Sequence, residues 1–74
     1  MEKDEQNSAI IRLGLTIRKI RETTTSFSQD KLALEVDLSE NQIRRIELGQ
    51  TNPTIKTLLK IAKALNVDIK ELLI

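Results

Sequence analysis

The chain has 74 residues and a formal net charge of +1, with no cysteine, no histidine and a single aromatic residue, Phe27. This length predicts one domain with a small core and no separate catalytic or ligand-sensing module. Without cysteine or histidine, a disulfide framework, a thiolate metal site and the usual general base are excluded, so we expect no metal and no cofactor. No apolar run approaches the roughly 20 residues that cross a bilayer, which predicts a cytoplasmic protein with no membrane contact.

The first seven residues are polar, acidic and aperiodic, and we expect residues 1–7 to form a flexible N-terminal arm. A first helix is predicted over residues 8–22, because Leu13, Ile17 and Ile20 recur along one helical face. The hydroxyl and β-branched residues at 23–26 favour extended or capping geometry, so the helix is expected to end before them.

Residues 28–49 contain two short apolar patterns with a turn between them. Leu32 and Val36 recur at helical spacing in the first pattern, and Ile43 and Ile46 do so in the second. The few residues that separate the two patterns are enough for a turn only. The segment therefore predicts a helix-turn-helix.

The second helix of this pair has a polar face. Ser39 is placed to cap its N-terminus through the hydroxyl group. Five hydrogen-bonding side chains lie opposite its apolar positions: Glu40, Asn41, Gln42, Arg44 and Arg45. Such a face can contact the edges of bases.

The remaining segments predict two more helices. Thr54 is placed to cap a fourth helix that runs to Leu65, and Asn66 suits the left-handed residue that ends it. Asp68 can cap a final short helix. The predicted fold is therefore all-α, a compact five-helix domain over residues 8–74.

The charge is unevenly distributed. Between Ser39 and Lys63 the sequence has five basic residues and two acidic ones. A basic patch on a nearly neutral protein is suited to phosphate, because attraction depends on the local contact surface. A solvated, lysine-rich helix face explains the same pattern, and the charge alone does not decide between them. With one aromatic residue, base-stacking on single-stranded nucleic acid is excluded.

Four segments occur in a familiar order and spacing: LGLTIRKIRE, SQDKLA, I-x-x-I-E-x-G and NPTIKTLLKIAKALNVDIKELL. In these segments, from about Leu13 to Leu73, the chain resembles the XRE family, the lambda-repressor and Cro-like helix-turn-helix domains. The resemblance implies a five-helix domain that binds double-stranded operator DNA as a symmetric dimer, with its third helix in the major groove.

Three features depart from the family pattern. The loop between the first two helices is about one residue longer than usual and lacks the expected glycine. Asp37 stands where the family commonly has glycine, although aspartate tolerates the left-handed region better than most residues. Leu48 occupies a position that is often basic, which removes a phosphate contact and exposes an apolar side chain.

The polar face of the third helix offers base contacts. Asn41 can bond adenine at N6 and N7, and an arginine can bond guanine at O6 and N7. Arg44 and Arg45 are consecutive and point about 100° apart, so we expect one to contact a base and the other a phosphate. The resemblance favours Arg45 for the base. Glu40 can accept from cytosine N4 or simply complement the helix dipole.

Phosphate contacts are expected at the helix N-termini and the loops beside them. The resemblance gives Gln29 such a contact next to the capping Ser28, although capping without DNA contact is the alternative. The expected phosphate set is Ser28, Gln29, Ser39, Thr51, Asn52, Thr54 and Lys56. The resemblance also implies an internal ion pair between Arg21 and Glu47, mainly structural, with Arg21 also able to touch phosphate.

Catalysis is not expected, because no nucleophile has a candidate base. The sequence instead predicts a sequence-specific transcription regulator, a dimeric repressor or autoregulator similar to phage repressors and restriction-modification controllers, on a pseudo-palindromic operator. Its homodimer interface is expected at Ile69, Leu73 and Ile74. The alternative is an antitoxin-like or regulator-binding interaction module that captures a protein partner through apolar residues such as Ile11 and Leu15, which can equally serve the dimer.

Overall fold

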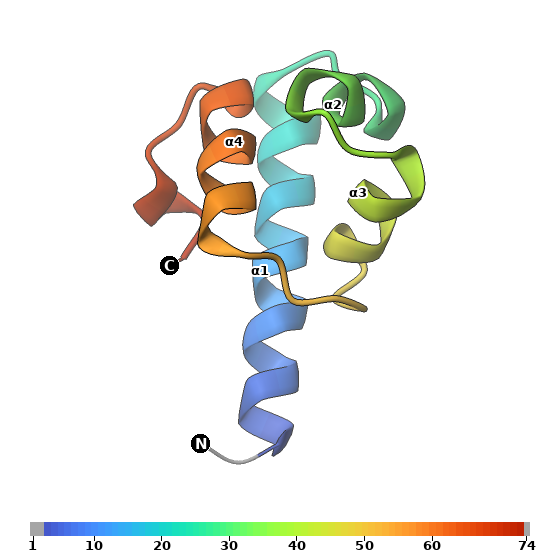
Figure 1. Cartoon of the computed structure of the whole chain (residues 1–74). Coiled ribbons are helices and arrows are strands. Elements are labelled where there is room, and N and C mark those ends of the chain that lie inside the picture. Colours follow the sequence, from blue (N-terminus) through green and yellow to red (C-terminus); the bar gives the residue numbers. More distant parts are fainter. Residues whose placement is uncertain (1–2, 74) are drawn as a thin grey trace.

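The computed structural model describes the backbone of residues 3–73 and the side chains of residues 7–73, and this part of the chain is all-helical (Figure 1). Four α-helices follow one another: α1 (Lys3–Thr24), α2 (Gln29–Val36), α3 (Glu40–Glu47) and α4 (Ile55–Leu65). A short 3₁₀ helix, η1 (Ile69–Glu71), comes after them. Helices α3 and α4 pack on the C-terminal half of α1, and α2 packs on both of them. None of the described helices is both long and apolar enough to cross a membrane.

The predicted fifth α-helix is wrong, because η1 is a three-residue 3₁₀ turn. Asp68 caps it through its side chain, as expected, and the Glu71 carboxylate accepts from the Asp68 backbone N–H at 2.9 Å. Directly after this turn Leu72 enters the core and is almost completely buried. A single capped turn that must deliver a side chain inward at once favours the tight 3₁₀ geometry over an α-helix.

The predicted ends of the first helix are also wrong, because α1 begins at Lys3 and ends at Thr24. Lysine, glutamate and glutamine are good helix formers, so the helix extends toward the N-terminus without an apolar stripe. Most of the segment expected to be a flexible arm is thus helical, and it projects beyond the other helices (Figure 1). Residues 1–2 of that arm lie outside the described residues.

Threonine hydroxyls account for the later C-terminal end of α1. Thr23 Oγ1 donates to Lys19 O at 2.7 Å, and Thr24 Oγ1 donates to Ile20 O at the same distance. Thr25 Oγ1 donates to Arg21 O at 2.6 Å. These hydroxyls bond to carbonyls of the preceding turn and not to the backbone of an extended or capping conformation, so residues that often end a helix are accommodated in this one.

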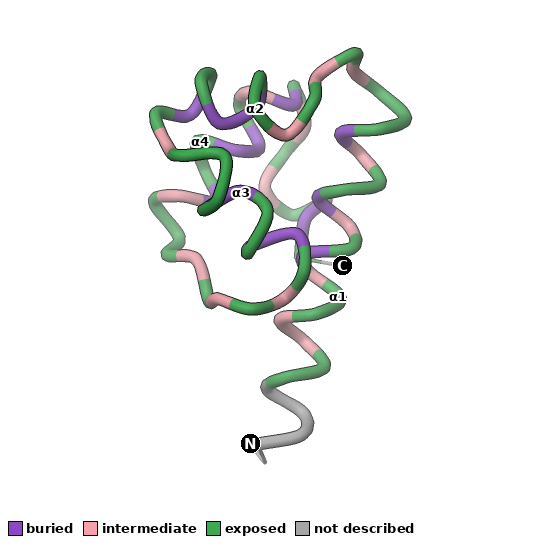
Figure 2. The backbone as a smooth tube through the Cα atoms, turned by 90° about the vertical axis from the view of Figure 1, so that its right-hand side faces the viewer, coloured by how far each residue is buried: buried purple, intermediate pink, exposed green. Residues whose placement is uncertain are grey.

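One hydrophobic core joins all four helices (Figure 2). Its largest fully buried side chains are Ile17, Leu32, Ile43, Ile61 and Leu72. Gly14 lies tightly against α3, because a Cβ atom there would lie 2.4 Å from the backbone oxygen of Ile46. Only glycine lets α1 and α3 approach this closely, a requirement that helical periodicity did not reveal.

Two left-handed residues end helices as predicted. Asp37 has φ 58° and ends α2, where the backbone N–H of Leu38 reaches back to Ala33 O at 2.9 Å. Asn66 has φ 60° and ends α4. The aspartate therefore supplies the turn of the helix-turn-helix in place of glycine.

Candidate nucleic-acid interface

Helix α3 is divided sharply into a buried apolar face and an exposed polar face. Ile43 and Ile46 are buried in the core. Ser39 Oγ accepts from the Gln42 backbone N–H at 3.1 Å, and Gln42 Oε1 accepts from the Ser39 backbone N–H at 2.8 Å. This capping box fixes the start of the helix. The five predicted base-contact residues, Glu40, Asn41, Gln42, Arg44 and Arg45, are all exposed.

A buried polar network fixes the other end of α3. The Glu47 carboxylate accepts from Arg21 Nε at 2.7 Å and from Arg21 Nη2 at 3.0 Å. Gln29 Nε2 donates to the same carboxylate at 2.9 Å, and Arg21 Nη1 donates to the Phe27 carbonyl at 3.0 Å. The network ties α1, the start of α2 and the end of α3 together.

Burial decides the role of this network. Arg21 and Glu47 are the two charged residues in the described core, and Glu47 is only 2% exposed. The hydrogen bond to Glu47 raises the pKa of Arg21 and outweighs the opposing effect of burial. Nε, Nη1 and Nη2 each donate to an internal partner, which agrees with the structural role expected of Arg21. Each terminal nitrogen has a second N–H group, so the additional phosphate contact of Arg21 stays a prediction.

Two of the exposed α3 side chains contact each other. Arg44 Nη2 donates to Asn41 Oδ1, one turn earlier on the helix. Gln42 has its carbonyl oxygen engaged in the capping box and its amide nitrogen left for a ligand. Arg45 faces the loop that leads to α4. The polar face is therefore partly organised before any ligand binds.

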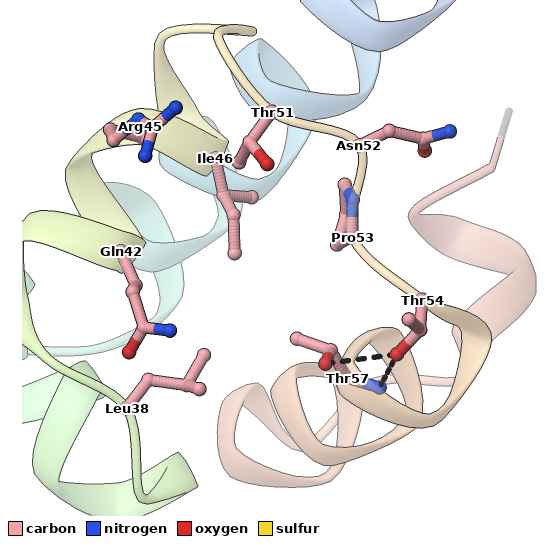
Figure 3. Close-up of a pocket in the computed structure, with 9 residues that line it drawn as sticks. All are labelled: Leu38, Gln42, Arg45, Ile46, Thr51, Asn52, Pro53, Thr54 and Thr57. Atoms are coloured by element: carbon pink, nitrogen blue, oxygen red, sulfur yellow. Dashed lines mark hydrogen bonds between the residues drawn. The ribbon is translucent and has the colours of Figure 1, made fainter.

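The loop before α4 forms a hollow of about 230 Å³ beside this face (Figure 3). Gln42 and Arg45 line one side, and Thr51 and Thr54 line the other. Figure 3 shows the Thr51 hydroxyl directed into the hollow and the Asn52 side chain directed away from it. Of the predicted phosphate residues, Thr51, Asn52 and Thr54 thus line the same hollow as the base-contact residues Gln42 and Arg45, with the Asn52 side chain directed outward.

The other predicted phosphate residues lie at separate places. Ser28 caps α2, with its Oγ accepting from the Lys31 backbone N–H at 3.1 Å. Gln29 is half-buried and occupied by Glu47, so its remaining amide hydrogen and its oxygen are what it can offer a ligand. Lys56 is exposed in the first turn of α4. The predicted phosphate residues therefore form two groups, one at the N-terminus of α2 and one at the loop and first turn of α4.

An apolar edge, defined here by Ile55, Leu59 and Leu73, was only partly predicted. These residues are 61%, 52% and 56% exposed. Ile55 and Leu73 line one shallow hollow of about 280 Å³. The signal in the sequence is the width of the α4 apolar arc, because Ile55 and Leu59 lie four residues apart at its margin, beyond the positions that one core can bury.

The residues expected at the dimer interface differ in their exposure. Leu73 is exposed, but Ile69 is half-buried and packs against the core. Ile74 lies outside the described residues. A second group, Ile11, Leu15 and Leu48, is also exposed, as the interaction-module alternative requires.

Comparison with known proteins agrees with this geometry. Residues 17–72 match the helix-turn-helix family HTH_3. The control protein C.BamHI of Bacillus amyloliquefaciens is 40% identical over 67 residues, which are 90% of this chain and 83% of that protein. The control protein C.MunI of Mycoplasma sp is 33% identical over 66 residues, which are 89% of each.

A solved structure has the same fold. The crystal structure of the restriction-modification controller protein C.AhdI from Aeromonas hydrophila superposes with a TM-score of 0.84 and 29% sequence identity. The match covers 88% of this chain and 97% of that one. The chain therefore belongs to the XRE family of helix-turn-helix DNA-binding proteins.

Proposed function

We propose that this DNA-binding transcription regulator is a dimeric repressor or autoregulator of the restriction-modification controller type, acting on a pseudo-palindromic operator. The observation that carries the proposal is the exposed polar face of α3, held at one end by a capping box and at the other by the buried Glu47 network. A rigid helix with outward hydrogen-bonding groups meets the requirement for contacts to base edges in the major groove. The relatives C.BamHI and C.MunI, both control proteins, support this class.

The contacts divide by type. Arg45 is the proposed base contact, because it stands on the exposed side of α3 beside the loop hollow. Thr51, Thr54 and Lys56 are proposed to hold phosphates on the α4 side, and Ser28 and Gln29 on the α2 side. Phosphate contacts set the register of the protein, and base contacts select the sequence.

The dimer is proposed to form through the apolar edge. Two recognition helices must lie about 34 Å apart to enter successive major grooves, so the two-fold interface must avoid α3. Figure 1 places η1 on the side of the molecule away from α3. Leu73 remains in the proposed interface, joined by Ile55 and Leu59, whereas Ile69 is largely used by the core. The interaction-module alternative is not favoured by the relatives.

Selection of genomic DNA fragments by the purified protein tests the proposal. We expect an enriched motif with two-fold symmetry. Arg45→Ala should cost about 1 to 3 kcal/mol on that motif and relax the preference at one base pair in each half-site, since a bidentate contact is lost. Lys56→Ala removes the same charge and should weaken binding to all sequences alike. Equal losses by both variants on the motif and on random DNA would contradict the division into base and phosphate contacts.

A further inference from the structure

The contact between Arg44 and Asn41 has a consequence for base preference. Both residues are exposed on α3, one turn apart, and Arg44 Nη2 donates to Asn41 Oδ1. A guanidinium group has only donors, so the Asn41 atom that faces it must be the carbonyl oxygen. The orientation of the asparagine amide is therefore fixed by chemistry, and its NH₂ group is the part left for a ligand.

Adenine does not suit this arrangement. Its major-groove edge offers an acceptor at N7 and a donor at N6, so an asparagine must present its oxygen to N6 and its NH₂ group to N7. In this structure the Asn41 oxygen already carries a hydrogen bond from a cation. The oxygen has a second lone pair, but the N6 amino group would have to bind it directly beside the guanidinium, and two positively polarised donors this close repel each other.

Guanine does suit it, because its edge presents two acceptors, N7 and O6. The Asn41 NH₂ group and the remaining N–H groups of Arg44 form a set of donors only. We propose that Arg44 determines the specificity of Asn41, and that the two together select guanine where Asn41 alone would select adenine. This inference rests on the proposed DNA-binding function and identifies a base preference within it.

Glu40 is the competing partner for Arg44, since it lies four residues earlier on the same helix. In the described residues the ion pairs are Arg18–Glu22, Arg21–Glu47 and Lys31–Glu35, and Glu40 is in none of them. Arg45 faces the loop hollow instead and has its own proposed contact. The Asn41–Arg44 pair is therefore a separate unit on the α3 surface.

The test begins with selection from a random duplex library by the wild-type protein and by Asn41→Ala. The base pair whose preference changes in Asn41→Ala is the Asn41-dependent pair. Dissociation constants are then measured at low salt, where phosphate attraction keeps weak variants measurable, on four duplexes that differ only at this pair. The proteins compared are the wild type, Arg44→Met and Lys31→Met. Lys31→Met is the matched control, because it removes one exposed positive charge from α2.

We expect the wild type and Lys31→Met to prefer guanine at this pair. Arg44→Met should bind all four duplexes more weakly and shift the guanine-to-adenine ratio toward adenine by about tenfold or more, the discrimination of one bidentate contact. A wild-type preference for adenine would overturn the proposal, as would an unchanged ratio in Arg44→Met. Equal binding of the four duplexes by Arg44→Met would overturn it too, because Arg44 would then be the base contact itself. If the wild-type protein enriched no motif at all, the proposed function would fail first.

Discussion

Helices α3 and α4 use their apolar residues differently. On α3 both isoleucines are buried and every exposed position except the capping Leu48 is polar. On α4 the buried residues are Leu58, Ile61, Ala62 and Leu65, yet Ile55 and Leu59 remain exposed. Folding of one chain therefore buries the apolar side chains of α3 but leaves apolar side chains of α4 exposed. A polar ligand suits the first helix, and a second protein surface suits the second.

The two helices also differ in what holds them. α4 is held by apolar packing along most of its length. α3 is only eight residues long, and its position depends on the buried carboxylate of Glu47, the close contact at Gly14 and the capping box at Ser39. We therefore expect α3 to be the part of the fold most sensitive to single substitutions.

Glu47→Ala should have the largest effect. It leaves the Arg21 guanidinium buried without its counter-charge and leaves Gln29 without its acceptor, a loss that commonly costs about 3 to 5 kcal/mol. Denaturant unfolding followed by circular dichroism measures this directly. Glu35→Ala is the matched control, because its ion pair with Lys31 is half-exposed and worth about 0.3 to 0.5 kcal/mol. Similar losses in the two variants would contradict a special role for the buried network.

Gly14→Ala should rank second. The added Cβ would lie 2.4 Å from a backbone oxygen of α3, and backbone cannot move aside as a flexible side chain can. Overpacking of this kind costs about 1 to 3 kcal/mol, against a gain of up to about 1 kcal/mol from the better helix propensity of alanine. Lys19→Ala, on the exposed face of the same helix, should stay within about 0.5 kcal/mol of wild type. A stabilised Gly14→Ala protein would show that α1 and α3 are not in the close contact described.

Ser39→Ala should follow with a loss of about 1 kcal/mol, the usual value of an N-terminal cap. The Gln42 backbone N–H loses its acceptor, whereas the bond from the backbone N–H of residue 39 to the Gln42 side chain remains. Ser26→Ala, at an exposed loop position, serves as the control and should be nearly neutral. No difference between the two serine variants would indicate that α3 does not depend on its cap.

Much of the fold follows from apolar spacing and capping residues. Helices α2, α3 and α4 lie where the periodicity predicted them, and Ser39, Thr54 and Asn66 occupy their predicted capping positions. The start of α1 was missed because it depends on polar helix formers without an apolar stripe, and its end because it depends on threonine side-chain bonds. The form of η1 was missed because it depends on the inward path of Leu72. Apolar periodicity does not predict the exact residue at which a helix ends, or whether a short turn is α-helical or 3₁₀.

For the candidate site, the sequence predicts which residues lie on the exposed face of α3, but not the contacts that these residues make. The exposed face of α3 follows from the positions of Ile43 and Ile46, so the set of polar residues on it could be named from the sequence. The Arg21–Glu47 pair joins residues 26 positions apart, and only the family resemblance indicated it. The Gln29 bond to Glu47 and the Arg44 bond to Asn41 depend on side-chain rotamers in the folded protein, which the sequence pattern does not contain.

The double variant Leu59→Glu with Leu73→Glu should have the smallest effect on folding. It should have the largest effect on dimer assembly. Both side chains are more than half exposed, so at protein concentrations where the wild type is monomeric the free energy of unfolding should change by about 0.5 kcal/mol or less. At higher concentrations the wild type should sediment as a dimer and the variant as a monomer, because carboxylates would repel across a two-fold axis. Leu34→Glu is the matched control, since Leu34 is 70% exposed on α2 and lies outside the apolar edge. If the Leu34 variant lost the dimer and the double variant kept it, the interface would lie on α2, and the contrast drawn between α3 and α4 would have to be replaced.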